Sequence, residues 1–117
     1  MEDNILKSTK KILSVPPDYE AYDHDILVGI NSAFGSLNQL GVTPSNLSIL
    51  DDGGSWDALA LSASMMNLVQ AYVYLKARKF FDPPATSFHI QAINEQIAEQ
   101  EFRISVLRDE ESAAANV

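Results

Sequence analysis

The chain has 117 residues, with 16 acidic and 8 basic side chains, no cysteine and a formal net charge of −8. The length predicts one domain, since typical domains run to about 100–150 residues, and the hydrophobic content of 46% predicts a globular core. The lack of cysteine excludes disulfides, thiolate metal sites and cysteine nucleophiles. No apolar run approaches the roughly 20 residues of a membrane span. The excess of acidic over basic side chains argues against a generic nucleic-acid binder.

The negative charge is concentrated in the first half of the chain. Residues 1–60 carry nine acids and three lysines, whereas residues 61–117 carry seven acids and five bases. The compact basic group is Lys76, Arg78 and Lys79. Unlike charged faces of this kind suit a contact between different surfaces of two copies. The acidic start, residues 1–4, has no long apolar run, so we do not expect a secretory signal there.

The first predicted helix runs from about Glu2 to Leu13. Ile5, Thr9 and Ile12 recur at helical spacing and form one apolar stripe. Val15-Pro16-Pro17 is expected to end the helix, because proline lacks a backbone N–H and disfavours helix in the residue before it.

A second helix is predicted from about Asp23 to Leu40, followed by Gly41 as a left-handed cap. Its apolar residues step by four, three, four and three: Ile26, Ile30, Ala33, Leu37 and Leu40. Gly29 and Gly35 each cost about 1 kcal/mol relative to alanine in a helix interior. They therefore predict either a close approach of two helices or a weak helix.

Residues 43–57 are predicted to connect the second helix to the third. Asp51-Asp52-Gly53-Gly54 is a strong turn signal, and a small β-hairpin around it is an open alternative. The third helix is expected to start at Ala58 or Ser62 and to end at Phe80, and its wide apolar surface predicts burial on most sides.

The fourth helix is the longest and is predicted from about Thr86 to Asp109, with Thr86 or Ser87 as its cap. Its apolar ladder is nearly a heptad seam interrupted by Gln100: Ile90, Ile93, Ile97, Ile104 and Leu107. Together the elements predict an all-α, four-helix bundle-like domain over residues 1–109 and a flexible tail over residues 110–117.

Neither histidine has the surroundings of a metal site or a catalytic base. Asp23-His24-Asp25 could bind a divalent cation, but adjacent residues of a helix face different ways, so a solvated helix start is the preferred interpretation. His89 is expected on a helix surface. The segment Asp51–Asp57 is similar to a calcium loop but lacks the glycine at position six and the glutamate at position twelve, so we expect a tight turn.

Motifs for nucleophilic catalysis and for nucleotide binding are missing. The chain has no G-x-S-x-G segment and no glycine-rich phosphate loop. We therefore predict no catalytic, cofactor-binding or metal-binding residue, and a protein that is not an enzyme.

Several segments stand in an order that resembles the small head-to-tail connector, or adaptor, proteins of tailed bacteriophages. These segments are Ile5–Leu13, Asp25–Val42, Trp56-Asp57, Tyr72–Arg78 and Phe81–Phe88. The likeness covers about residues 4–108, and the stretch Phe81-Asp82-Pro83-Pro84-Ala85-Thr86-Ser87-Phe88 carries most of it. The positions that match the family and that we interpret as structural are Trp56, Tyr72, Phe81, Asp82, Pro83, Pro84 and Phe88.

The resemblance implies a helical subunit that assembles into a ring, twelve-fold in the virion, without catalytic residues or cofactors. The ring would lie beneath the portal protein, extend the DNA channel without sequence-specific binding, and present a surface to the next head-closure or tail-completion protein. Docking on the portal would use the end of the fourth helix and residues 110–117. The implied location is the head–tail junction of the virion, with assembly in the host cytoplasm.

Residues that could contact a partner or a second copy come from the two long helices: Lys76, Arg78, Lys79, Arg103, Leu107 and Arg108. The three bases of the third helix could equally serve only to complement the helix dipole. At least two of Phe80, Phe81 and Phe88 are expected to be buried anchors of the corner between the long helices. An alternative function is a small helical interaction module, such as a dimeric regulatory or antitoxin-like protein that uses the fourth helix as a coiled-coil seam.

Overall fold

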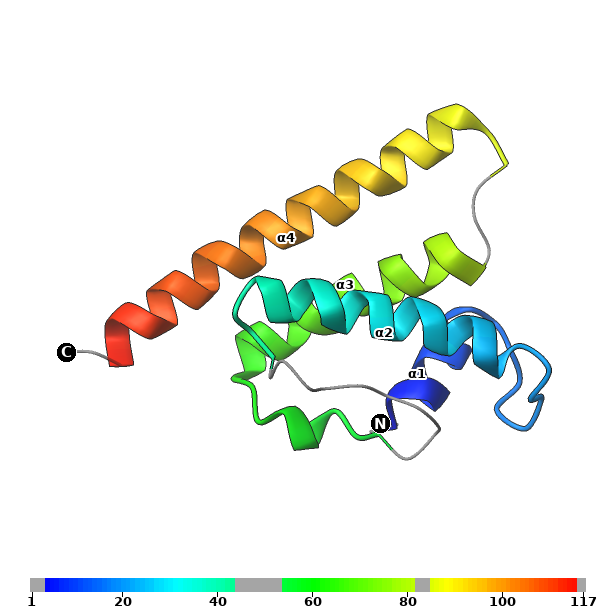
Figure 1. Ribbon diagram of the computed structural model, residues 1–117, viewed down its shortest axis with the longest axis horizontal. Helices are drawn as coiled ribbons and strands as arrows, with labels where there is room; N and C mark the ends of the chain where they lie inside the picture. The colour runs from blue at the N-terminus through cyan, green and yellow to red at the C-terminus, as the bar shows by residue number, and fades with distance from the viewer. Residues whose placement is uncertain (1–3, 44–53, 82–84, 116–117) are drawn as a thin grey trace.

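The computed structural model describes residues 4–43, 54–81 and 85–115, and its regular elements are helices (Figure 1). In chain order they are α1 (Ile5–Ile12), α2 (Asp23–Gln39), the short 3₁₀ helix η1 (Asp57–Leu59), α3 (Ala63–Phe81) and α4 (Ser87–Ala115). The described residues contain one isolated antiparallel bridge, between Asn4 and Ser55. The predicted all-α class is confirmed. None of the described helices is long and apolar enough to cross a membrane.

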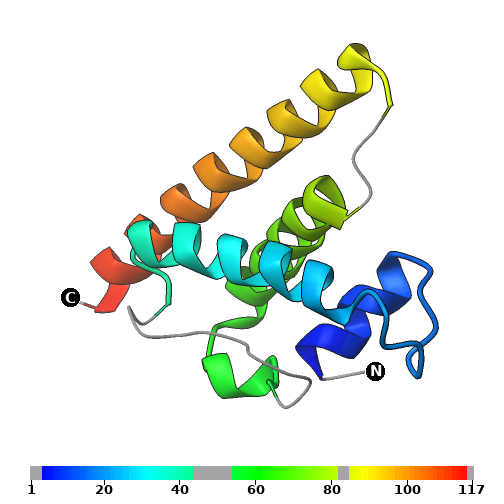
Figure 2. The same cartoon turned by 45° about the vertical axis from the view of Figure 1, so that its right-hand side comes forward.

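Helix α3 is the centre of the fold. It packs against α1, α2 and α4, whereas α4 packs against α3 alone among the described helices (Figures 1 and 2). The wide apolar surface of the third helix is thereby explained. The hydrophobic side chains that lose essentially all contact with solvent come from the four helices: Ile5, Ile26, Ile30, Ala33, Phe34, Leu37, Val69, Tyr72, Val73, Ala77 and Ile104.

The two glycines of α2 have different surroundings. A Cβ atom on Gly29 would lie 2.8 Å from the Cα atom of Ala77 on α3, which is closer than side chains pack. A Cβ atom on Gly35 would meet nothing within 4 Å. The predicted close approach of two helices is therefore found at Gly29 and not at Gly35. Gly41 follows α2 with a φ of +80°, as expected of a left-handed glycine cap.

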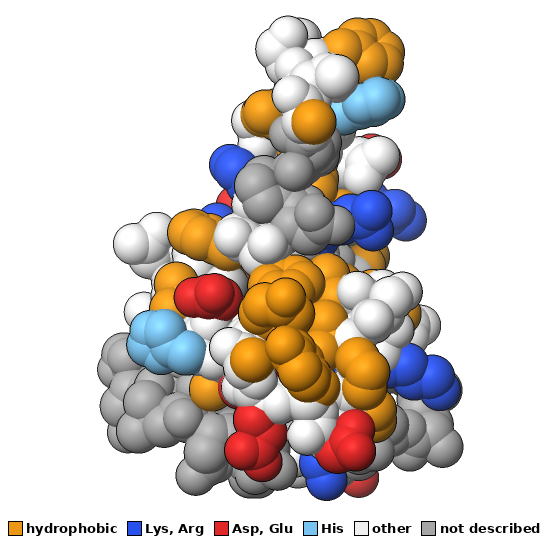
Figure 3. Space-filling model, turned by 90° about the vertical axis from the view of Figure 1, so that its right-hand side faces the viewer, with side chains coloured by type: hydrophobic (Ala, Val, Ile, Leu, Met, Phe, Trp, Pro, Cys, Tyr) orange, Lys and Arg blue, Asp and Glu red, His pale blue; other side chains and the backbone are white. Residues whose placement is uncertain are grey.

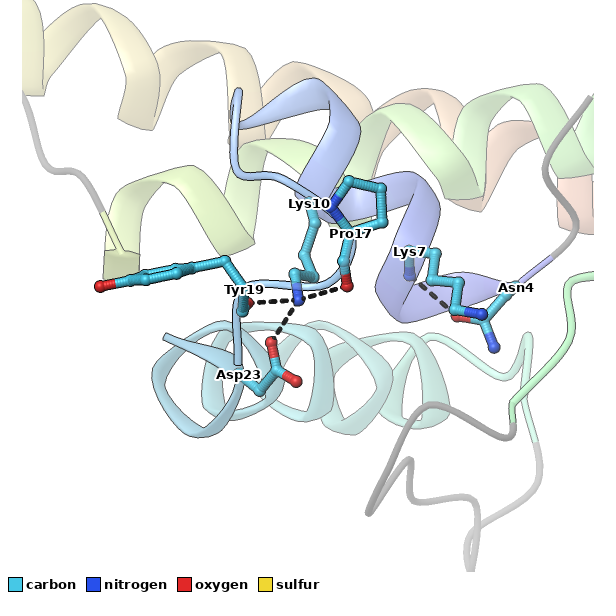
Figure 4. Close-up of polar contacts among 6 residues, drawn as sticks. All are labelled: Asn4, Lys7, Lys10, Pro17, Tyr19 and Asp23. Atoms are coloured by element: carbon cyan, nitrogen blue, oxygen red, sulfur yellow. Dashed lines mark hydrogen bonds and ion pairs between the residues drawn. The ribbon is translucent and has the colours of Figure 1, made fainter. Parts of the chain in front are cut away.

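Lys10 is buried beneath the loop that joins α1 to α2, with 1% of its surface exposed. Its Nζ atom donates to the carbonyl oxygens of Pro17 at 3.0 Å and Tyr19 at 2.7 Å, and lies 2.7 Å from the Asp23 carboxylate (Figure 4). The three donors of the ammonium group thus meet three oxygen atoms. This corrects the predicted stripe of α1, in which Ile12 was a core position: Ile12 is half-exposed, and Lys10 lies in the interior instead.

Helix α1 begins later than predicted. Asn4 is extended, and its Oδ1 atom accepts a hydrogen bond from the backbone N–H of Lys7 at 2.8 Å, so the helix starts at Ile5 and not at Glu2. Trp56, near the end of the connector, is buried, and its indole N–H donates to the Ser8 hydroxyl at 2.8 Å. The hairpin considered around Asp51-Asp52-Gly53-Gly54 lies outside the described residues except for Gly54.

The long helices begin at polar caps. The backbone N–H of Met65 donates to the Ser62 hydroxyl, so Ser62 caps α3, which starts at Ala63 rather than at either position predicted. Thr86, one of the two caps predicted for α4, accepts a hydrogen bond from the backbone N–H of His89. Both caps satisfy backbone donors that the first helical turn leaves unpaired.

Helix α4 continues through part of the predicted tail. It ends at Ala115 and not at Asp109, so residues 110–115 are helical. The Ser62 hydroxyl donates to the Glu111 carboxylate at 2.5 Å and joins this last part of α4 to the start of α3. The three consecutive alanines at its end are the strongest helix formers, which explains why the helix does not stop earlier.

Candidate interaction surfaces

Tyr72 joins α3 to α4 in the interior. Its ring is fully buried, and its hydroxyl donates to the Glu101 carboxylate at 2.6 Å. Burial, followed by this hydrogen bond, raises the pKa of the Tyr72 phenol well above its usual value. The Lys76 ammonium lies 5.8 Å from the centre of the same ring, within the range of a cation–π contact. Tyr72 is therefore a structural residue that holds α4 in place.

Replacing Tyr72 with phenylalanine is expected to lower the free energy of unfolding by about 1 kcal/mol, because the Glu101 carboxylate loses its donor while the ring stays packed. Urea denaturation followed by circular dichroism measures this change. The matched variant Glu101→Gln keeps an acceptor oxygen and should cost less. An unchanged unfolding midpoint in Tyr72→Phe would contradict the assignment.

The structure does not gather the six predicted interface residues at one place. Lys76 lies against Tyr72, and Arg78 and Lys79 are exposed in the last turn of α3. Arg108 donates to the backbone carbonyl of Leu40 at the end of α2 and pairs with Asp109 at 2.7 Å. Arg108 therefore has a partner within the chain. Arg103 and Leu107 lie in a groove that the sequence did not reveal.

This groove, here called the α3–α4 groove, runs between the start of α3 and the second half of α4. Its volume is about 470 Å³. It is lined by Ser64, Asn67 and Leu68 of α3 and by Phe102, Arg103, Val106, Leu107 and Glu110 of α4. Phe102 is 69% exposed although it is aromatic. An exposed apolar groove of this kind is a feature of surfaces that bind another protein.

A second apolar surface, the aromatic patch, lies at the opposite end of α3. It consists of the ring cluster of Tyr19, Tyr22 and Phe81, together with the exposed Phe80, the neighbour of Phe81 in the last turn of α3. The Tyr22 ring stacks edge-on against Tyr19 at 5.3 Å and against Phe81 at 5.1 Å between ring centroids. Figure 3 shows hydrophobic side chains gathered where this loop meets the end of α3. The exposed acids Asp18 and Glu20 belong to the same loop.

The expectation of two buried phenylalanine anchors at the corner is wrong. Phe80 is 51% exposed and Phe88 is 75% exposed, and Phe81 is only partly covered. Phe88 lies five residues before the buried Ile93, which on a helix turns its side chain away from the α3-facing side. The remaining motif residues Asp82-Pro83-Pro84 lie outside the described residues.

The histidines are both on the surface. His24 is exposed near the start of α2, and the exposed His89 lies with its Nδ1 atom 2.9 Å from the Thr86 hydroxyl. Within residues 4–43, 54–81 and 85–115, no group of three or more acidic or histidine side chains is placed to hold a metal ion.

Sequence reasoning named Arg103 and Leu107 of the groove, but it missed the groove residues Phe102 and Val106 and the patch residues Tyr19 and Tyr22. Phe102 and Val106 lie on the side of α4 away from the Ile97 and Ile104 ladder, and their offset from the ladder was a signal available in the sequence. Tyr19 and Tyr22 lie in a loop, where no helical periodicity of apolar residues indicates which side chains are exposed.

Uncovered apolar surfaces at opposite ends of the central helix are typical of a small helical protein that binds other proteins. A profile of phage connector proteins matches residues 5–111. The chain therefore belongs to the phage connector family, which assigns it a connector role, association with the virion and interaction with other components of virion assembly. Comparisons with curated proteins and with solved structures returned no match.

Proposed function

We propose that the protein is a head–tail connector subunit that forms a ring beneath the portal protein and extends the DNA channel, with no chemistry of its own. The observation that carries this proposal is the family match over residues 5–111. The two uncovered surfaces support it, because a closed ring needs two different patches that meet on neighbouring copies. A twelve-fold ring is the expected form in the virion.

The charge of the chain supports a channel that lets DNA pass. Each contact between a basic side chain and a phosphate adds salt-dependent affinity. A chain with a formal net charge of −8 makes a wall that does not hold the duplex. DNA would therefore pass without sequence-specific binding.

The partners in this proposal are the portal protein on one side and the head-closure or tail-completion protein on the other. The portal would be contacted by the end of α4 together with residues 116–117. The contact of Glu111 with Ser62 supports this, because it fixes the direction in which the end of α4 leaves the core. Assembly in the host cytoplasm followed by residence at the head–tail junction of the virion completes the proposal.

The alternative function, a dimeric regulatory or antitoxin-like module, requires the apolar seam of α4 for pairing. Ile97 and Ile104 of that seam are buried in the core of the single chain. A coiled-coil dimer through the seam would have to open the packing of α4 on α3. The structure therefore favours the connector function over this alternative.

The proposed assembly is tested by light scattering of the purified full-length protein with and without the portal protein. We expect a monomer of 12.9 kDa or a ring, and ring closure with twelve copies when the portal is present. Binding of one monomer to each portal subunit would also support the proposed ring. A stable dimer in both conditions would contradict the proposal.

A further inference from the structure

We propose that the aromatic patch of one copy binds in the α3–α4 groove of the next copy. This inference rests on the proposed ring and names the two surfaces that form its subunit contact. The occupant of the groove is thus a second copy of this chain, and not a portal segment or a small molecule.

The positions of the two surfaces make the contact intermolecular. Leu68 of the groove and Phe80 of the patch are separated by twelve residues of one helix, or about 18 Å at 1.5 Å per residue. A rigid helix cannot bring its own two ends together. In Figure 1 the start and the end of α3 lie on opposite sides of the molecule. One copy therefore leaves both surfaces uncovered until a second copy binds.

The side chains of the two surfaces complement one another. The patch offers large aromatic rings that are about half exposed, and the groove offers the exposed apolar side chains of Phe102 and Val106 in its lining. Aromatic residues are enriched in the buried centre of protein interfaces. Ser64 and Asn67 on the groove rim supply hydrogen-bond partners for the phenol groups of Tyr19 and Tyr22.

The charges beside each surface fix the orientation of the contact. Asp18 and Glu20 lie in the loop of Tyr19, and Arg103 lies in the wall of the groove. On the other side, the exposed Lys79 next to Phe80 has Glu110 of the groove as its opposite charge. One orientation satisfies both pairs, and the reversed orientation places like charges together.

A contact between two different surfaces has a further consequence. Each added copy brings one free patch and one free groove, so assembly continues until the first and last copies meet. A closed two-fold dimer would have to place both patches in both grooves at the same time, and the variant that carries both thiols, described below, would then stop at dimers. A ring or an open chain instead links more than two copies through the same contact.

The contact is tested by cysteine cross-linking in the full-length protein, which contains no cysteine of its own. Tyr19→Cys and Phe102→Cys place single thiols on exposed positions of the patch and the groove. Under oxidation in the assembled state, with portal present, we expect a cross-linked dimer only when the two variants are mixed. The variant that carries both changes should give a ladder of higher multimers.

The matched control is Phe88→Cys, an exposed aromatic position outside both surfaces. A mixture of Tyr19→Cys and Phe88→Cys should not cross-link. Equal yields from this mixture and from the patch–groove mixture would overturn the inference, as would dimers formed by either variant alone.

Charge reversal gives a second test that does not depend on thiol geometry. Arg103→Glu is expected to weaken assembly about tenfold, and Glu20→Arg in the same chain should restore it. Circular dichroism verifies that each variant folds. Failure of the double variant to assemble better than Arg103→Glu would overturn the contact. Rings that form without patch–groove cross-links would overturn this inference alone, and the absence of any assembly with portal would overturn the proposed function as well.

Discussion

Replacing Lys10 with methionine is expected to lower the free energy of unfolding by about 3 kcal/mol. Methionine fills a similar volume, but it leaves the carbonyl oxygens of Pro17 and Tyr19 and the carboxylate of Asp23 without their shared donor. Removing one partner of a buried ion pair costs about 3–5 kcal/mol, and Asp23 remains partly exposed to water, which favours the lower end of that range. Equilibrium denaturation in urea measures the loss.

The chain offers a matched control in the next residue. Lys11→Met removes the same charge at an exposed position of α1 and should change stability by less than about 0.5 kcal/mol. Because Lys10 also holds the loop that carries Tyr19 and Tyr22, the Lys10→Met variant should lose cross-linking from the aromatic patch even at temperatures where it remains folded. Equal stability of the two lysine variants would contradict the buried role of Lys10.

Alanine at the two glycines of α2 is expected to change stability in opposite directions. Gly29→Ala should destabilise the fold by about 1–2 kcal/mol, because its new methyl group would lie 2.8 Å from the Ala77 Cα atom and would force α2 and α3 apart. Gly35→Ala should stabilise it by up to about 1 kcal/mol, because the site is open and alanine is the better helix former.

Thermal and urea denaturation of these two variants provides a direct comparison, since both make the same chemical change in the same helix. Leu or Val at position 29 should cost more than alanine, because a larger side chain cannot be accommodated by a small shift of α3. A Gly29→Ala variant as stable as Gly35→Ala would show that the two helices are not as close in solution as in the structure.

Most of the fold was accessible from local sequence signals. The apolar periodicity of residues 23–40 and 86–109 predicted α2 and most of α4, and Gly41 and Thr86 marked helix ends correctly. These signals act over one or two helical turns, so they can be recognised in the sequence without the tertiary structure. The glycines of α2 predicted either a close helix contact or a weak helix, and only the position of Ala77 in the packed structure shows that the close contact is at Gly29.

The surfaces were less accessible, because exposure depends on how helices cross. Lys10 has the sequence position of a surface lysine near a helix end, whereas its hydrogen bonds to Pro17 and Tyr19 place it beneath the loop that joins α1 to α2. At least two of Phe80, Phe81 and Phe88 are expected in the core from their hydrophobicity, yet Phe80 and Phe88 are exposed and Phe81 is only partly covered. The predicted interface residues are charged apart from Leu107, and the way α3 and α4 pack adds an apolar groove around Phe102.

Because α4 packs on α3 alone among the described helices, it can tilt about its most buried contact, at Ile104. The exposed fraction of its isoleucines rises from 0% at Ile104 to 38% at Ile90, so its hold on α3 weakens toward its start. Ser87 lies about 26 Å along the helix from Ile104, and a tilt of about 5° at that contact moves the start of α4 by about 2 Å. The start of α4 can therefore shift while the α3–α4 groove near Ile104 and the core formed by α1, α2 and α3 stay the same.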